Sequence, residues 1–371
     1  MAVLIVFIDS LRPVDAAELP FIGQLSQVRS VRPGFGYSVN LHAELFAGAR
    51  PDDVGFFCEW HLDPDRSPGR RLRPILPLLD AVLHPYVFNR GVQHLLTRGY
   101  RPGHPMPNVP LRHIDKFALA AIPITSPDFP VPSLFSRHPE LLVITAPPGV
   151  RKGRRDEAVF GRALSAVDSA TAVLAVLPDL DGISHVAGVG TDVYWATLHQ
   201  IDRHLSELVR VFRRAHPEGH VFVVSDHGMS NVEGRVRLDV ERQCGPARLD
   251  RYMFFSDATM LRVWLRDHRL RPRLESALSS VPHARLVTEE ERTAYGLTNR
   301  AFGDWILVLE EGYCFEPSYF ARHAPRAMHG YHPDDEGHQA LYAHEGPALQ
   351  TEPTTLVDVY AALEEAISEG S

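Results

Sequence analysis

The sequence predicts an α/β fold, a three-layer sandwich in which helices cover both faces of a mostly parallel central sheet. The first observation is a set of short, continuous apolar runs at residues 2–8, 141–145, 172–177, 220–225 and 339–343. Strands that are buried on both faces read as continuous rather than alternating apolar runs. The second observation is that helical patterns separate these runs, as in sheets that have helices on both faces.

The clearest helical pattern covers residues 191–215. Thr191 can cap the first turn, and arginines crowd the last turn, where they complement the helix dipole. An apolar stripe along one side of this helix is expected to face the sheet. It consists of Val193, Leu198, Ile201, Leu205 and Leu208. A last helix is expected at residues 354–367.

Two segments interrupt the alternation of strands and helices. Residues 61–135 are rich in Pro, Arg and His, and residues 245–325 read as a small α+β unit. We therefore expect a core made of residues 1–244 and 326–371, with an insert at about 61–135. Residues 245–325 are expected to form a smaller inserted cap subdomain.

The composition is that of a soluble globular protein, with 44% hydrophobic and 23% charged residues. The net charge of -8 argues against binding to a nucleic-acid polymer. The first apolar run is followed at once by Asp9, and is too short for a signal peptide or a membrane span. Three widely spaced cysteines fit a reducing compartment better than a disulfide framework. The sequence therefore predicts a cytoplasmic protein with no membrane partner, and it leaves the oligomeric state open.

Acidic and imidazole side chains lie where the predicted strands end or begin. They are Asp9 after the first run, Asp181 and His185 after the run at 172–177, Asp226 and His227 after the run at 220–225, and His329 before the last run. Ligands of open α/β sheets bind at the carboxyl ends of the strands. Carboxylate and imidazole ligands suit zinc, or manganese as a second choice. The sequence therefore predicts a site for two divalent metal ions.

A serine is placed to meet these ions. A glycine-containing loop leads into Ser38, and the following residues read as a helix that ends at Gly48. A helix N-terminus favours anions, and contact with a metal ion turns a serine hydroxyl into a better nucleophile. The alternative is that Ser38 only caps the helix.

Five motifs in a fixed order carry a family resemblance: FIDSLRP, YSVNLHAELFAGARPDDVG, DGISH, SDHGM and MHGY. With them the sequence resembles the alkaline phosphatase superfamily, and is most similar to its nucleotide pyrophosphatase/phosphodiesterase branch. The resemblance covers roughly residues 2–58, 140–243 and 326–368. It implies that Asp181, His185 and His329 hold one zinc ion. The other ion would be held by Asp9, Asp226, His227 and the nucleophile oxygen of Ser38.

Two positions depart from the pattern of this branch. Its nucleophile is typically a threonine, followed three positions later by an asparagine that holds a phosphoryl oxygen. Here the nucleophile position is Ser38, position 41 is leucine, and Asn40 lies one position early. Either Asn40 makes the oxyanion contact through a shifted turn, or a backbone N–H replaces it.

The resemblance implies a metal-dependent phosphoester hydrolase that works through a phosphoseryl intermediate on Ser38. The expected substrate is a small phosphodiester or pyrophosphate, with a nucleotide as one half. One alternative is a phosphomonoesterase that uses the same site. Another is a catalytically silent metal-binding module, for which Leu41 is the only support. A sulfatase or a phosphomutase fits the motifs less well.

Aromatic residues cluster near the loop that leads to Ser38. Phe35, Tyr37 and Phe57 are candidates for stacking on a flat leaving group, although core packing is the alternative for at least half of this cluster. His42, His332 and His338 lie close to the motifs, but we do not expect them to be metal ligands.

Overall fold

The computed structural model describes the whole chain except residues 77, 80–86, 88–89, 93–94, 96–104 and 370–371. Its largest sheet has six strands. In spatial order these are β2 (Gln27–Val31), β16 (Ala340–Glu345), β7 (His220–Val224), β1 (Val3–Ile8), β6 (Ala172–Leu177) and β5 (Leu142–Ile144). All five predicted apolar runs are strands of this sheet.

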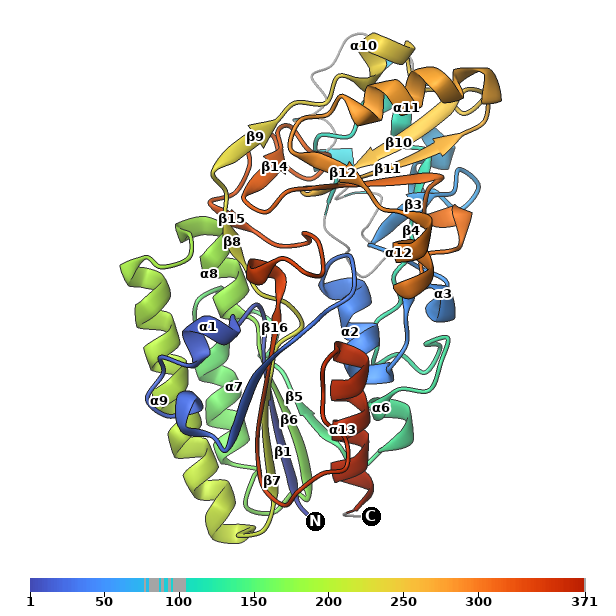
Figure 1. Cartoon of the computed structure of the whole chain (residues 1–371). Coiled ribbons are helices and arrows are strands. Elements are labelled where there is room, and N and C mark those ends of the chain that lie inside the picture. The colour runs from blue at the N-terminus through green and yellow to red at the C-terminus, as the bar shows by residue number, and fades with distance from the viewer. Residues whose placement is uncertain (77, 80–86, 88–89, 93–94, 96–104, 370–371) are drawn as a thin grey trace.

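The direction of one strand differs from the prediction. Strands β7, β1, β6 and β5 are parallel, whereas β16 is antiparallel to both of its neighbours, β7 and β2. At the carboxyl end of β7 the chain leaves the sheet and forms other elements. It returns to the start of β16 at that same end of the sheet (Figure 1). A strand that re-enters where its neighbour left must run in the opposite direction.

Helices cover both faces of the sheet, so the predicted three-layer sandwich is confirmed (Figure 1). One layer contains α1 (Pro13–Ala16), α7 (Arg155–Leu164), α8 (Asp179–Ala187) and α9 (Asp192–Ala215), and the other contains α2 (Ser38–Ala47), α6 (Leu134–Arg137) and α13 (Leu356–Ser368). Alternate residues of β1 point to opposite layers. Leu4, Val6 and Ile8 pack in the cluster that contains α9, and Val3, Ile5 and Phe7 in the cluster that contains α13. This double coverage explains the continuous apolar run.

Helix α9 agrees closely with the predicted range, and Thr191 caps it by accepting a hydrogen bond from the backbone N–H of Tyr194. One residue of the predicted stripe is wrong, because Val193 is 58% exposed. Residues three and four apart share a helix face, and Val193 lies five positions before Leu198. The stripe that is buried begins at Tyr194 and continues through Leu198, Ile201, Leu205, Leu208 and Phe212.

A second, antiparallel sheet of four strands lies above the first in Figure 1. Its strands, in spatial order, are β10 (Tyr252–Ser256), β11 (Met260–Leu265), β13 (Trp305–Leu309) and β12 (Ala284–Leu286), and helices α11 (Arg271–Ser279) and α12 (Glu289–Ala294) accompany them. All of these elements fall inside the predicted cap, residues 245–325. Trp60 lies just before the predicted insert, and Phe117 lies within it. Both residues pack in the same apolar cluster as this sheet. The proposed domain boundaries themselves stay a prediction.

The remaining elements in the part of the chain that the structure describes are short. They are α3 (Pro51–Val54), β3 (Trp60–Leu62), β4 (Phe117–Leu119), β8 (Ser230–Asn231), β9 (Gly234–Val236), α10 (Val240–Cys244), β14 (Tyr313–Phe315) and β15 (Ala327–Met328). Single turns of 3-10 helix occur at Ile22–Gln24, Pro68–Leu72, Leu111–His113, His268–Leu270, Arg300–Phe302 and Glu336–His338.

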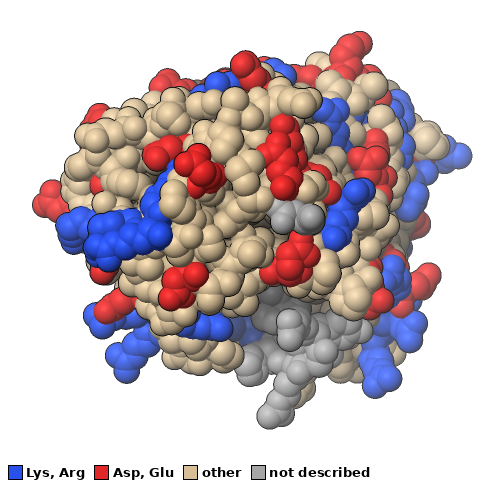
Figure 2. All heavy atoms as spheres, turned by 90° about the horizontal axis from the view of Figure 1, so that it is seen from below, with Lys and Arg blue, Asp and Glu red and all other residues tan. Residues whose placement is uncertain are grey.

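The surface at the foot of the large sheet, seen in Figure 2, carries basic and acidic side chains interspersed with uncharged ones. Mixed charge of this kind is typical of a solvated surface. Among the helices of the described residues, none combines the length and the apolar character that crossing a bilayer requires.

Candidate active site

The predicted ligands meet at one end of the large sheet, where the parallel strands β1, β6 and β7 have their carboxyl ends. We call this end of the sheet its carboxyl edge. Asp9 directly follows β1, Asp181 lies in the first turn of the helix after β6, and His227 follows β7. Strand β16 runs the other way, so its beginning lies at the same edge. His329, which precedes β16, is therefore brought to the same place as the residues that follow the parallel strands.

Asp181, His185 and His329 form one group of potential ligands, whose ligand atoms all lie within 4.8 Å of one another. Asp181 and His185 share a face of α8 because they are four residues apart. The Nε2 atoms of His185 and His329 lie 3.2 and 3.8 Å from Asp181 Oδ1. Nδ1 of His185 is 2.8 Å from the carbonyl oxygen of Ala327. A carbonyl only accepts, so Nδ1 donates, and Nε2 is the ring nitrogen that faces Asp181.

A second group contains Asp9, Asp181 and His227, again with ligand atoms within 4.8 Å of one another. Nε2 of His227 lies 3.7 Å from Asp9 Oδ1 and 3.0 Å from the hydroxyl oxygen of Ser38. Nδ1 of His227 donates to the carbonyl of Gly228 at 2.8 Å. The same tautomer therefore holds at both histidines, with Nε2 as the atom that faces the site.

The sequence prediction grouped Asp226 rather than Asp181 with Asp9 and His227, and this assignment stays a prediction. Asp181 belongs to both groups and so lies between them. Asp226 Oδ2 lies 3.3 Å from Nε2 of His227 and 3.2 Å from Nε2 of His42. The fully buried Asp226 carboxylate therefore faces two imidazole rings.

Burial and neighbouring groups shift the pKa of all three carboxylates. Burial, together with the nearby charges of Asp181 and Asp226, raises the pKa of Asp9 well above its usual range. Burial has the same tendency at Asp226, but His227 and His42 outweigh it and lower the pKa of Asp226 to about 2. The pKa of Asp181 is also lowered against the effect of burial, mainly by His185.

Several oxygens of these carboxylates lack a hydrogen-bond partner among the described residues, although they are buried. They are Oδ1 of Asp9, Oδ1 of Asp181 and both oxygens of Asp226. Buried carboxylates are costly unless they are paired with positive charge or hydrogen-bond donors. Unpaired carboxylate oxygens beside imidazole nitrogens are a donor set that fits divalent cations.

Ser38 is the first residue of α2, and its hydroxyl points to His227 as described above. The residue that caps the helix is Tyr37, whose backbone is extended (φ -128°, ψ 171°). The alternative role of Ser38 as the capping residue is therefore not what the structure shows. Its side chain is left to face the ligand groups.

Asn40 braces the loop that leads into α2. Its Oδ1 accepts from the backbone N–H of Tyr37 at 3.2 Å, and its Nδ2 donates to the carbonyl of Phe35 at 2.7 Å. Gly36 lies between them with φ +120°, and a Cβ there would come within 2.1 Å of Asn40 Oδ1. These contacts are all inside the loop, so the oxyanion contact of Asn40 stays a prediction.

Two of the three aromatic candidates belong to the core. Phe35 and Phe57 are each 1% exposed and pack in a cluster with Met260 and Ile306. They offer no surface to a substrate, and the alternative of core packing is correct for both. Tyr37 is partly exposed, and its ring edge approaches the ring of His329, with centroids 5.6 Å apart.

The sequence analysis gave no role to two histidines that lie beside the site. His42 contacts Asp226, and its position four residues after Ser38, on the same helix face, is a signal that could have found it. His338 is buried, with Nε2 3.3 Å from the carbonyl oxygen of Gly34. Burial and the nearby charge of His227 lower the pKa of His338 to about 3. No local pattern marks His338.

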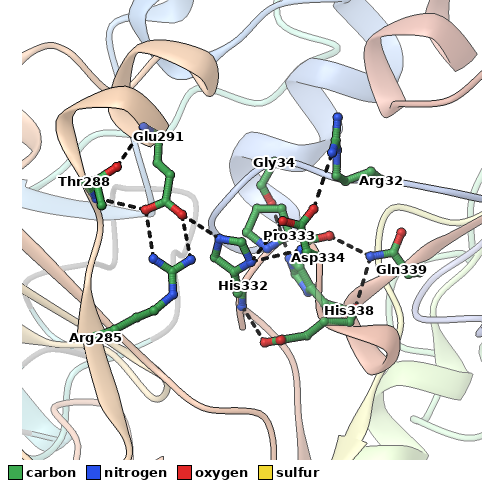
Figure 3. A network of polar contacts seen from close by, with 11 residues as sticks. Arg32, Gly34, Arg285, Thr288, Glu291, His332, Pro333, Asp334, His338 and Gln339 are labelled. Carbon is green, nitrogen blue, oxygen red and sulfur yellow. Dashed lines mark hydrogen bonds and ion pairs between the residues drawn. The ribbon is translucent and has the colours of Figure 1, made fainter.

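The segment between His332 and Gln339 contacts both the four-stranded sheet unit and the loop that leads to Ser38, as Figure 3 shows. His332 Nε2 lies 3.0 Å from Glu291 Oε1 on α12, and Glu291 is also held by Arg285 through two hydrogen bonds of 2.7 and 2.8 Å. On the other side, Asp334 lies 3.4 Å from Arg32 in the loop that leads to Ser38. The loops on either side of the site are thus tied to each other and to α12.

Comparison with known proteins agrees with this geometry. Residues 149–332 match the family described as type I phosphodiesterase / nucleotide pyrophosphatase. No curated protein matches the sequence. Human ectonucleotide pyrophosphatase/phosphodiesterase 5 has a similar structure, with a TM-score of 0.65 and 16% identity over 98% of this chain and 94% of that one.

Two further solved structures share the fold. A murine ectonucleotide pyrophosphatase/phosphodiesterase 5, inactive and in complex with AMP, has a TM-score of 0.64 and 16% identity, covering 99% of this chain and 95% of that one. The phosphonoacetate hydrolase of Sinorhizobium meliloti 1021, in complex with phosphonoformate, has a TM-score of 0.65 and 13% identity, covering 98% and 95%. The family match and the shared fold confirm the resemblance predicted from the five motifs: residues 149–332 match the phosphodiesterase / nucleotide pyrophosphatase family, and the whole chain has the fold of these neighbours, which supports its activity as a phosphoric ester hydrolase.

Proposed function

We propose that this protein hydrolyses small phosphodiesters or pyrophosphates in two steps, through a phosphoseryl intermediate on Ser38. The observation that carries the proposal is the position of the Ser38 hydroxyl. It lies at the N-terminus of α2, 3.0 Å from His227 Nε2, at the edge where two groups of metal-ligand atoms meet. A nucleophile, a helix N-terminus and cation ligands in one place are the parts that phosphoryl transfer requires.

The donor set fits two divalent ions, which we expect to be zinc, or manganese as an alternative. Asp181, His185 and His329 would hold one ion, and Asp9, His227, Asp226 and Ser38 the other, with Asp181 placed between them. Bound ions supply positive charge that favours the serine alkoxide and offsets the charge that develops on the phosphoryl oxygens.

The residues of the chain account for the two displacements. The Ser38 hydroxyl gives its proton to water, Oγ attacks the phosphorus, and the bond from phosphorus to the leaving-group oxygen breaks, after which this oxygen takes a proton from water. The phosphoryl group is then bound to Ser38, where the N-terminus of α2 favours its negative charge. Water attacks the phosphorus from the side that the leaving group vacated. The bond to Oγ breaks, the attacking water releases a proton, and Ser38 Oγ takes up a proton from solvent.

A diester is supported over a monoester by the family match and by one ion pair. A phosphomonoester carries an additional charge, which needs an additional positive group in the site. Arg12, the basic residue nearest to Asp9 in the sequence, is paired with Asp15, with its Nε 2.6 Å from Asp15 Oδ2. A nucleotide as one half of the substrate is suggested by the AMP that the murine structure contains.

The test uses a chromogenic phosphodiester and the matching monoester, assayed in parallel with zinc or with manganese. We expect the diester to react faster, and Ser38→Ala to abolish turnover while metal content stays nearly intact. Ser169→Ala, which alters an exposed serine, is the matched control and should behave as wild type.

Each other result has a definite meaning. Normal turnover by Ser38→Ala would overturn the covalent route. A faster monoester would make the protein a phosphomonoesterase. If the metal-loaded protein hydrolysed neither ester, it would be a silent metal-binding module, and the proposed function would be wrong.

A further inference from the structure

The turn between β10 and β11 contacts residues of the candidate active site. Thr259, in this turn, is fully buried. Its hydroxyl oxygen lies 2.7 Å from the carbonyl oxygen of Gly330, 3.1 Å from that of His329 and 2.9 Å from the hydroxyl oxygen of Tyr37. One side chain of the four-stranded sheet therefore contacts both the residue before Ser38 and the backbone of a predicted metal ligand.

The directions of these hydrogen bonds follow from their partners. The backbone N–H of Thr259 donates to the Tyr37 hydroxyl at 3.1 Å. The Thr259 hydroxyl has one proton, and carbonyl oxygens only accept, so this proton goes to Gly330 or His329. The Tyr37 hydroxyl must then donate to Thr259. The two hydroxyls thus form a continuous chain, which we call the Thr259–Tyr37 hydroxyl pair.

The hydroxyl pair is joined to the backbone next to two residues of the candidate site, Ser38 and His329. Tyr37 caps α2 and precedes Ser38, so a displacement of Tyr37 displaces the nucleophile. His329 precedes Gly330, and its ring stacks on His227 with a centroid distance of 3.7 Å. A shift of the His329 backbone would therefore move Nε2 relative to Asp181 and His227.

The packing around the pair leaves little freedom. Gly330 has φ +83°, and a Cβ there would come within 2.5 Å of the Tyr37 ring and 2.8 Å of the Thr259 hydroxyl. The turn that carries Thr259 is itself anchored, because Asp257 forms a fully buried ion pair with Arg262 at 2.9 Å. Arg262 also donates to the carbonyl of Trp60 at 2.6 Å.

We propose that Thr259 and Tyr37 are positioning residues, through which the four-stranded sheet sets the Ser38 hydroxyl and the His329 imidazole in one geometry. The proposal rests on the roles of Ser38 and His329 given under the proposed function. Catalytic geometry must be held within about half an ångström, and partners of a metal ligand are worth about 10–100-fold in metal affinity or activity. Loss of the pair should therefore weaken metal binding and slow turnover together.

The test removes each hydroxyl while keeping the shape of the side chain. Thr259→Val and Tyr37→Phe are expected to lower kcat about 10–100-fold, with a smaller change in KM, and to weaken zinc binding by a similar factor. Thr259→Ser keeps the hydroxyl and should restore both values to within a few-fold of wild type. Tyr252→Phe, which removes a buried tyrosine hydroxyl bonded at 2.5 Å to the carbonyl of Gly245, is the matched control and should change neither.

Zinc affinity is measured by competition with a chromogenic chelator, and kcat and KM with the chromogenic ester. If Thr259→Val only lowered the melting temperature, as Tyr252→Phe can, and left kcat and zinc affinity unchanged, the proposal would be wrong. It would also be wrong if Thr259→Ser lost as much as Thr259→Val. Should Thr259→Val not fold, Tyr37→Phe decides the matter. If wild type hydrolyses neither ester, the proposed function fails, and zinc affinity alone still tests the hold on His329.

Discussion

His42 shows how one side chain can support the site without belonging to the predicted ligand set. Its Nε2 lies 3.2 Å from Asp226 Oδ2, and its ring stands edge-on to Phe7, with centroids 5.2 Å apart. The apolar packing fixes the ring, and the ring in turn orients the buried Asp226 carboxylate. His42 thus resembles the supporting partners that usually orient metal ligands.

His42→Phe should therefore weaken zinc binding and slow ester hydrolysis, each by about 10-fold. The expected cause is a freer Asp226 carboxylate, and chelator competition measures the affinity. His204→Phe is the matched control, because His204 also packs on a phenylalanine, Phe160, at 5.2 Å but lies on α9. Equal zinc affinities of His42→Phe and wild type would show that Asp226 needs no such support.

Glu44 on α2 makes stability depend on pH. Burial raises its pKa from 4.5 to about 8, against the opposing effect of the hydrogen bond from Gly34 N–H at 3.0 Å. Because the folded pKa is above the unfolded one, the stability that protonated Glu44 contributes is fully present below pH 4.5. It is lost as the pH rises through about 8.

Glu44→Gln keeps an oxygen that can accept from Gly34 N–H but does not titrate. We expect the difference in free energy of unfolding between this variant and wild type to shift in favour of the variant from about pH 5 to about pH 8. Chemical denaturation of both proteins at the two pH values measures this difference. A difference that stays constant with pH would show that Glu44 is ionised throughout.

At the scale of elements, the entry to α2 decides where Ser38, the proposed nucleophile, lies. Gly36 combines a left-handed φ of +120° with a close approach to the Asn40 amide. A side chain at this position would strain the backbone and also push away the amide that accepts from Tyr37 N–H. The chain can therefore enter the helix in this geometry only with glycine at position 36.

Gly36→Ala should destabilise the protein by about 1–3 kcal/mol and slow turnover, because Ser38 shifts with the loop. Gly55→Ala separates the two causes. Gly55 has φ +76°, but a Cβ there meets nothing within 4 Å, so this control has the backbone strain without the clash. Denaturant unfolding and ester hydrolysis are measured for both. Equal losses in activity would mean that the contact with Asn40 does not matter.

At the scale of the whole molecule, the fold gathers three carboxylates at one end of the large sheet, where they are available to cations. Asp9, Asp181 and Asp226 come from three different strand ends and meet there. A cation that binds only the folded chain stabilises it by mass action, by about 2.7 kcal/mol when its free concentration is one hundred times Kd. Folding and metal binding are therefore expected to be linked.

Zinc should raise the melting temperature in a concentration-dependent way, and a chelator should reverse the effect. Asp181→Asn is expected to reduce this shift strongly, because Asp181 belongs to both ligand groups. Asp128→Asn, at an exposed aspartate, is the control and should keep the full shift. A melting temperature that does not respond to zinc or manganese would contradict the metal site.

The sequence by itself determined the features that depend on local pattern. Continuous apolar runs revealed the strands because each residue of β1 packs against one of two helix layers. The capping residue Thr191 and the 3.6-residue period of the apolar residues revealed α9. The candidate ligands were found because the position after a parallel strand is local information, and the common edge follows from the fold class.

Only the tertiary structure decided what depends on the path of the chain. The reversed direction of β16, the burial of Phe35 and Phe57, and the place of Asp181 between two ligand groups have no local signature. The contact between Tyr37 and Thr259 joins residues 222 positions apart. Such contacts depend on how whole layers pack against each other, and the residue pattern of a single segment does not predict this packing.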